Sequence, residues 1–122
     1  MAKRQLRWRT GRTLDCLLAA SAYLTLLYDR ARAAELVGRL QSDADFGWWR
    51  ANDLLRAAGL APLPPSDPGV RKALKPRRRH APVLVLSRPV GAIIADGYHR
   101  ISAAYSIDPF SKVPCFVASI DF

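Results

Sequence analysis

The residues best suited to chemistry in this chain lie together at Asp96–Arg100. The apolar run Ala92–Ala95 before them is typical of a buried strand, and the residues that follow have the spacing of a helix. A helix that begins directly after Gly97 presents free backbone N–H groups and the positive end of its dipole. With His99 and Arg100 in its first turn, we expect this point to bind an anion, and in particular a phosphate group.

The charge distribution predicts an acidic partner. The formal net charge of the 122 residues is +9, and residues 1–88 hold 17 of the 19 Lys and Arg but 7 of the 10 acidic residues. The first 88 residues therefore carry +10 and the rest −1. Nucleic acid is the first expectation for such a basic segment, and a membrane surface is the second. The alternative is a basic composition inherited from a GC-rich genome.

Two arginine-rich segments could contact nucleic acid. Residues 1–12 predict a basic arm that lies along phosphates and stacks Trp8 on a base, although a frayed, solvated terminus would have the same composition. Residues 75–80 form a second basic cluster, which we expect on a loop before the first strand; a solvated face is again the alternative. The expected nucleic-acid contacts are Arg4, Arg7, Arg9, Arg77, Arg78 and Arg79.

The two cysteines and the apolar segment near the N-terminus indicate a cytoplasmic protein with no membrane partner. Cys16 and Cys115 form no C-x-x-C pair, so we expect buried thiols in a reducing compartment. Leu14–Tyr28 is strongly apolar, but Asp15 interrupts it and it is shorter than the ~20 residues that span a bilayer. A buried amphipathic helix is the better interpretation.

The pattern predicts one α+β domain, with residues 1–74 mainly helical and residues 82–122 forming a small mixed sheet with one helix. Phe46, Trp48 and Trp49 form an aromatic cluster that we expect to pack helices together, with a stacking platform as the alternative. The predicted helices cover 13–28, 29–40, 52–59, 70–74 and 98–107; the strands cover 83–86, 92–95 and 113–120; and 41–47 is a loop.

Residues 82–120 resemble the ParB/sulfiredoxin-like superfamily. Ile94–Ala104 matches a strand followed by a Gly-x-(His/Arg)-Arg turn that opens a helix, and Val113–Val117 matches the Val-Pro-x-x-Val start of the next strand. Pro82–Leu86 matches the strand that leads into the motif. The resemblance implies a small mixed sheet of ParB/sulfiredoxin type.

The resemblance also implies that the turn binds nucleotide phosphates. Gly97, His99 and Arg100 match the phosphate-binding positions, Tyr98 lies among them, and a nucleoside triphosphate with Mg²⁺ is the expected ligand. Asp96 matches an acidic position where a carboxylate could hold a metal or accept a proton. Tyr98 stands where sulfiredoxin has its cysteine, so that covalent chemistry lacks its nucleophile.

Three hypotheses follow from these residues. The first is a nucleotide-binding module that associates with DNA through its basic front half. The second is an enzyme, either a phosphotransferase or a metal-dependent nuclease, with Asp96 and His99 as its catalytic groups. In the third there is no ligand, because His99 only caps its helix and Arg100 pairs with Asp96 or Asp108. The sequence does not predict an oligomeric state.

Overall fold

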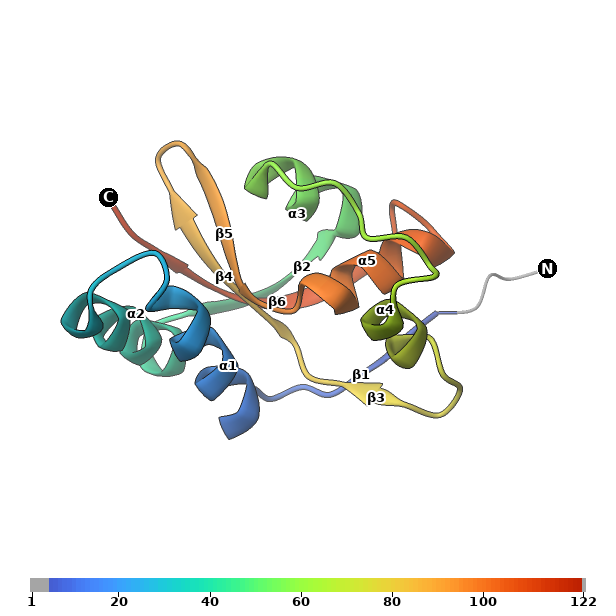
Figure 1. The fold of residues 1–122 in the computed structure, drawn as a ribbon, viewed down its shortest axis with the longest axis horizontal. Coiled ribbons are helices and arrows are strands. Elements are labelled where there is room, and N and C mark those ends of the chain that lie inside the picture. The colour runs from blue at the N-terminus through green and yellow to red at the C-terminus, as the bar shows by residue number, and fades with distance from the viewer. Residues whose placement is uncertain (1–4, 122) are drawn as a thin grey trace.

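The computed structural model describes residues 5–121, and over this range the chain forms five helices and two sheets (Figure 1), which confirms the predicted α+β class. The elements in chain order are β1 (Arg7–Trp8), α1 (Leu14–Leu24), α2 (Arg30–Ser42), β2 (Asp45–Arg50), α3 (Ala51–Ala58), α4 (Pro68–Ala73), β3 (Arg79–His80), β4 (Val83–Arg88), β5 (Gly91–Asp96), α5 (Tyr98–Ile107) and β6 (Lys112–Ser119).

The larger sheet is mixed and has the strand order β2-β6-β4-β5. β4 pairs antiparallel with β5 and parallel with β6, and β6 pairs antiparallel with β2. The three predicted strands are all present, and α5 covers the predicted range 98–107. Because β4 and β6 are parallel, the chain must cross the sheet between them, and β5 with α5 makes that connection.

Helices cover both faces of this sheet. Leu84 and Leu86 of β4 pack with α1 and α2, whereas Val83 and Val85 of the same strand pack with α3 and α5. Figure 1 shows these two pairs of helices on opposite sides of the strands. A strand that is buried on both faces needs apolar residues at successive positions, which explains the continuous apolar run of β4.

The front half of the chain is less helical than expected, because β1 and β2 both lie in it. The predicted loop 41–47 is wrong: α2 continues to Ser42, and β2 begins at Asp45. β2 is an edge strand that pairs with β6 from Asp45 to Arg50. Aromatic residues favour strands, so this composition suits a strand better than a loop.

The expectation that the aromatic cluster packs helices together is also wrong. Phe46, Trp48 and Trp49 lie on β2, and 44%, 50% and 38% of their surfaces are exposed. Phe46 packs on Phe116 of β6, with 5.1 Å between ring centroids. These aromatic residues are therefore partly exposed side chains on the two faces of an edge strand.

Helix α1 begins where the sequence predicts and ends earlier. The Thr13 side chain accepts a hydrogen bond from the Cys16 N–H, which confirms the predicted N-cap, but the helix ends at Leu24 instead of continuing to Tyr28. Cys16 and Cys115 are both buried free thiols, as expected. Within residues 5–121, no helix is long and apolar enough to cross a membrane.

Packing of α2 on the sheet makes the front half part of the hydrophobic core. Leu36 of α2 is fully buried, whereas Leu18 of α1 is 59% exposed. We expect Leu36→Ala to lower the free energy of unfolding by about 2–5 kcal/mol, because it leaves a cavity in the core. Leu18→Ala should change it by less than about 0.5 kcal/mol. Urea denaturation measures both, and equal effects would contradict this packing.

Candidate functional site

The turn before α5 can be built only with glycine. Gly97 has a φ of 118° and provides no side-chain cap for the helix. A Cβ atom at this position would lie 2.6 Å from Cγ2 of Val83. The chain thus passes from β5 into α5 close against β4, and the first N–H groups of α5 donate to no capping side chain.

Arg100 is held by Asp96 across this turn. Its Nη2 donates to Oδ2 of Asp96 at 2.9 Å and to the carbonyl of Pro82 at 3.4 Å. Both side chains of the ion pair are largely buried. The buried Nε of Arg100 has no hydrogen-bond partner among residues 5–121. The pairing expected under the hypothesis of no ligand is therefore present, but it leaves the buried Nε–H of the guanidinium group unused.

His99 lies against α4. Its side chain is 57% exposed, and its Nε2 is 3.5 Å from Oδ2 of Asp67. A Cβ atom on Gly69 would lie 2.2 Å from Cδ2 of His99, so the ring packs directly on that glycine. Asp67 also accepts hydrogen bonds from the N–H groups of Gly69 and Val70 at the start of α4. The same carboxylate thus caps α4 and orients His99.

The other predicted residues of the turn have structural partners. The Tyr98 hydroxyl donates to the carbonyl of Ala61 in the connector between α3 and α4. Asp96 is bonded to Arg100 and His99 contacts Asp67, and within the described range no hydrogen bond or ion pair joins Asp96 to His99. The structure therefore does not bring the two predicted catalytic residues together as a pair.

The two arginine-rich segments meet in a separate two-stranded sheet. β1 and β3 are parallel, with Arg7 opposite Arg79 and Trp8 opposite His80, and the Arg9 N–H donates to the His80 carbonyl at 2.7 Å. We call the five exposed arginines of this sheet and the adjoining turn the arginine ribbon. Arg4 lies outside the described residues. The arginine ribbon consists of Arg7, Arg9, Arg77, Arg78 and Arg79.

Alternation along β1 explains the outward position of these arginines. Leu6 and Trp8 are partly buried against the core, so Arg7 and Arg9 between and after them point to solvent. Among residues 5–121, no acidic side chain forms an ion pair with any member of the arginine ribbon. The alternation of apolar and basic residues from Leu6 to Arg9 agrees with this short strand, but four residues are too few to predict it without β3 beside them.

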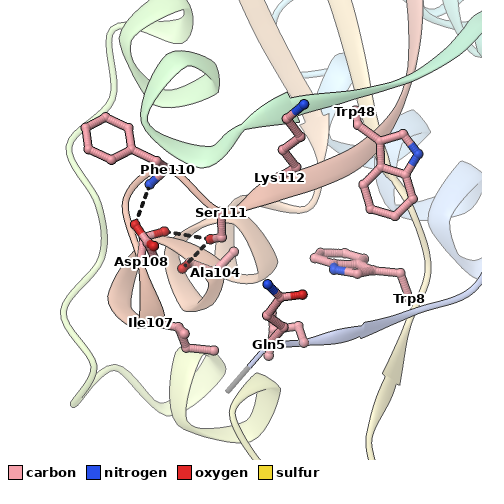
Figure 2. Close-up of a pocket in the computed structure, with 10 residues that line it drawn as sticks. Gln5, Trp8, Trp48, Ala104, Ile107, Asp108, Phe110, Ser111 and Lys112 are labelled. Atoms are coloured by element: carbon pink, nitrogen blue, oxygen red, sulfur yellow. Dashed lines mark hydrogen bonds between the residues drawn. The ribbon is translucent and has the colours of Figure 1, made fainter. Parts of the chain in front are cut away.

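A cleft that the sequence did not predict lies at the far end of α5 from Gly97. Its volume is about 590 Å³, and Figure 2 shows Trp8 of β1 and Trp48 of β2 on its wall together with Lys112 at the start of β6. We call it the tryptophan cleft. The remaining lining residues are Gln5, Leu6, Ala104, Ile107, Asp108, Phe110 and Ser111.

The buried Cys115 near Arg100 does not supply a reactive thiol. Burial raises the pKa of Cys115 to about 12, and the nearby Arg100 guanidinium offsets only part of that effect. The Cys115 thiol is therefore protonated at neutral pH and is not a nucleophile. Among the described residues, no group of three or more His, Cys, Asp or Glu side chains is placed to hold a metal ion.

Comparison of the chain with protein-family models, with curated proteins and with solved structures gives no match. The resemblance to the ParB/sulfiredoxin-like superfamily thus rests on the motif at Ile94–Ala104 and its flanking strands, and it stays a prediction.

The requirement for glycine at position 97 can be tested against a second glycine. Gly97→Ala should lower the free energy of unfolding by about 2 kcal/mol or more, because the residue keeps a positive φ and its Cβ collides with Val83. Gly38 lies inside α2, and a Cβ there would meet nothing within 4 Å, so Gly38→Ala should raise stability by about 0.5–1 kcal/mol. Thermal or urea unfolding measures both; an undiminished stability of Gly97→Ala would refute this geometry.

Proposed function

We propose that this chain is a nucleic-acid-binding module that recognises phosphate groups through the arginine ribbon. The observation that carries the proposal is the register of β1 and β3, which places Arg7 directly opposite Arg79. Two segments far apart in the sequence thereby present their positive charges on one surface.

Like charges at opposed positions of a sheet destabilise it. Here they lie on strands of only two residues each, which have few backbone hydrogen bonds to offset the repulsion. A polyanion that lies along the arginine ribbon would remove the repulsion and replace it with charge-assisted hydrogen bonds. Guanidinium groups suit this role, because their fixed fork of donors matches the oxygens of a phosphate.

The arginine ribbon differs from arginines elsewhere in the chain that form ion pairs with acidic residues. Arg32 is paired with Glu35, and both Arg50 and Arg56 are paired with Asp53. These pairs neutralise part of the positive charge of α2 and of the junction between β2 and α3. The five arginines of the arginine ribbon have no comparable partner within the described part of the chain, so they form a local concentration of positive charge.

Removing the two opposed arginines should weaken DNA binding and its dependence on salt. For Arg7→Gln combined with Arg79→Gln, we expect the slope of log K against log salt to fall by about 1.8, which corresponds to about 0.9 for each lost phosphate contact. Fluorescence anisotropy with a labelled DNA duplex over a range of NaCl concentrations measures the slope.

Arg30→Gln combined with Arg56→Gln is the matched control. It removes the same charge from exposed positions on α2 and α3, outside the arginine ribbon. The control should keep nearly the affinity and slope of the unchanged protein. Equal losses in the two double variants would show that only net charge matters, and an affinity that does not fall with salt would exclude phosphate contacts.

A second candidate function is nucleotide binding at the start of α5. The favouring observation is a helix that begins at Gly97 without a side-chain cap, beside an Arg100 that is fixed by Asp96 and has an unused Nε donor. A nucleoside triphosphate would place its phosphates on the N–H groups of this helix, with His99 at the edge of the site. The resemblance to the ParB/sulfiredoxin-like turn supports the same ligand, which would bring its own Mg²⁺.

A nucleotide that binds this turn should raise the melting temperature of the protein. At a concentration 100 times Kd, the added stability is ~2.7 kcal/mol. We expect one of CTP, ATP or GTP with Mg²⁺ to produce the shift, Arg100→Ala to abolish it, and the exposed variant His99→Ala to reduce it. Arg56→Ala, on a different helix, should retain it in full. Absence of a shift with all three nucleotides would eliminate this candidate.

A further inference from the structure

We infer that the tryptophan cleft binds an unpaired nucleobase, so that single-stranded nucleic acid is the preferred partner of this protein. The inference rests on the proposed function, because the arginine ribbon supplies the phosphate contacts. It adds a second kind of contact, aromatic stacking, and it joins Trp8 and Trp48, which the sequence offered as separate stacking residues, in one cleft.

Each of the two tryptophan rings packs against another aromatic ring. Trp8 packs on His80 with 5.5 Å between ring centroids, and Trp48 meets Phe46 edge-on at 6.2 Å. Phe46 in turn packs on the core residue Phe116. These ring contacts restrict the side-chain rotamers of the two tryptophans before any ligand arrives, which reduces the conformational entropy that binding must cost.

Exposure of Trp48 is the second argument. Half of its surface is open to solvent, although an indole ring gains more from burial than most side chains. Figure 2 shows the ring at the edge of the cleft, across from Trp8 and near Lys112. A flat aromatic ligand between the two tryptophans would cover this apolar surface, and a nucleobase has a π-face of that kind.

The size and charge of the cleft fit one nucleotide. A volume of about 590 Å³ lies in the range of small-ligand sites. Lys112 lies on its wall and forms no ion pair with any residue from 5 to 121. Asp108 is the one acidic side chain among the described lining residues, and its Oδ1 accepts a hydrogen bond from the Phe110 N–H. Lys112 therefore leaves an unpaired positive charge at the rim, which suits a phosphate beside a bound base.

Continuity with the arginine ribbon points to a single strand instead of a duplex. Trp8 lies between Arg7 and Arg9 in the sequence, and the two arginines point to the opposite side of the chain from Trp8, although successive residues of a strand are only about 3.3 Å apart. A flexible single strand with one base on Trp8 would thus pass over this edge to place its next phosphates beside the arginines. In a duplex, the bases are already stacked and paired, so a base could enter the cleft only after costly unstacking.

Trp48 and Trp49 provide a matched pair for the test, because neighbouring residues of β2 point to opposite faces. The probes are a fluorescein-labelled oligothymidylate of about 12 nucleotides, within the known range of single-strand site sizes, and a labelled duplex of equal length. Anisotropy titrations of the full chain at low salt give both affinities. We expect Trp48→Ala to weaken single-strand binding roughly 5- to 150-fold and to leave duplex binding within twofold. Trp49→Ala should leave both within twofold.

Lys112→Gln, at an exposed position, gives an independent test if Trp48→Ala lowers stability; it should weaken single-strand binding and reduce its salt slope by about 0.7. Single-strand affinity that is the same in Trp48→Ala, Trp49→Ala and the unchanged protein would overturn the stacking site but leave the arginine ribbon intact. If neither oligonucleotide binds, the proposed function and this inference both fail. Binding of a proline-rich peptide to the cleft in place of the oligonucleotide would also overturn the inference.

Discussion

The parallel pairing of β4 with β6 is the constraint on which the other features of this fold depend. Both strands are buried on both faces, so the sheet needs helices on each side of it. Their parallel direction also requires a connection that returns the chain to the end where β4 begins, and β5 and α5 provide it together. Gly97 therefore lies at one end of α5 and the tryptophan cleft at the other, about 15 Å apart for a helix of this length.

Helix α5 organises polar groups as well as apolar ones. Ser102 is fully buried, and its Oγ accepts a hydrogen bond from the Leu63 N–H. One turn earlier, the Tyr98 hydroxyl bonds the carbonyl of Ala61. These two bonds fix the proline-rich connector that positions α4, and α4 in turn carries the Asp67 that contacts His99. Residues of the motif thus stabilise the fold in addition to any part they have in binding.

Local signals in the sequence were enough to predict much of the fold. Thr13 caps α1, Asp67 and Pro68 begin α4, and Gly59 ends α3 in the left-handed conformation, each as its chemistry predicts. The range of α5 follows from the glycine before it and its helical spacing. In each case the residues that fix the element are close together in the chain, so a short window contains the necessary information.

Features that depend on distant partners were not predictable in this way. β1 has only two residues, and it forms because β3, far along the chain, passes beside it. β2 was hidden because Trp48 and Trp49 are adjacent, so its alternation of buried and exposed faces does not show as alternation of apolar and polar residues. The tryptophan cleft was not predictable either, since Trp8 and Trp48 on its wall come from these two unpredicted strands. For the turn at Gly97, the sequence placed the residues together, but it left open whether Arg100 pairs with Asp96.

The opposed arginines of β1 and β3 have a consequence for the N-terminal segment. This segment joins the fold through a two-residue ladder that mutual repulsion weakens, and the same segment supplies Trp8 to the cleft. An anion that neutralises Arg7 and Arg79 would tighten the ladder and fix the indole wall at the same time. By thermodynamic linkage, a base stacked on Trp8 must then strengthen anion binding in return. Anion binding at β1 and base stacking on Trp8 would then be cooperative, and a ligand that supplies both an anion and a base would bind most tightly.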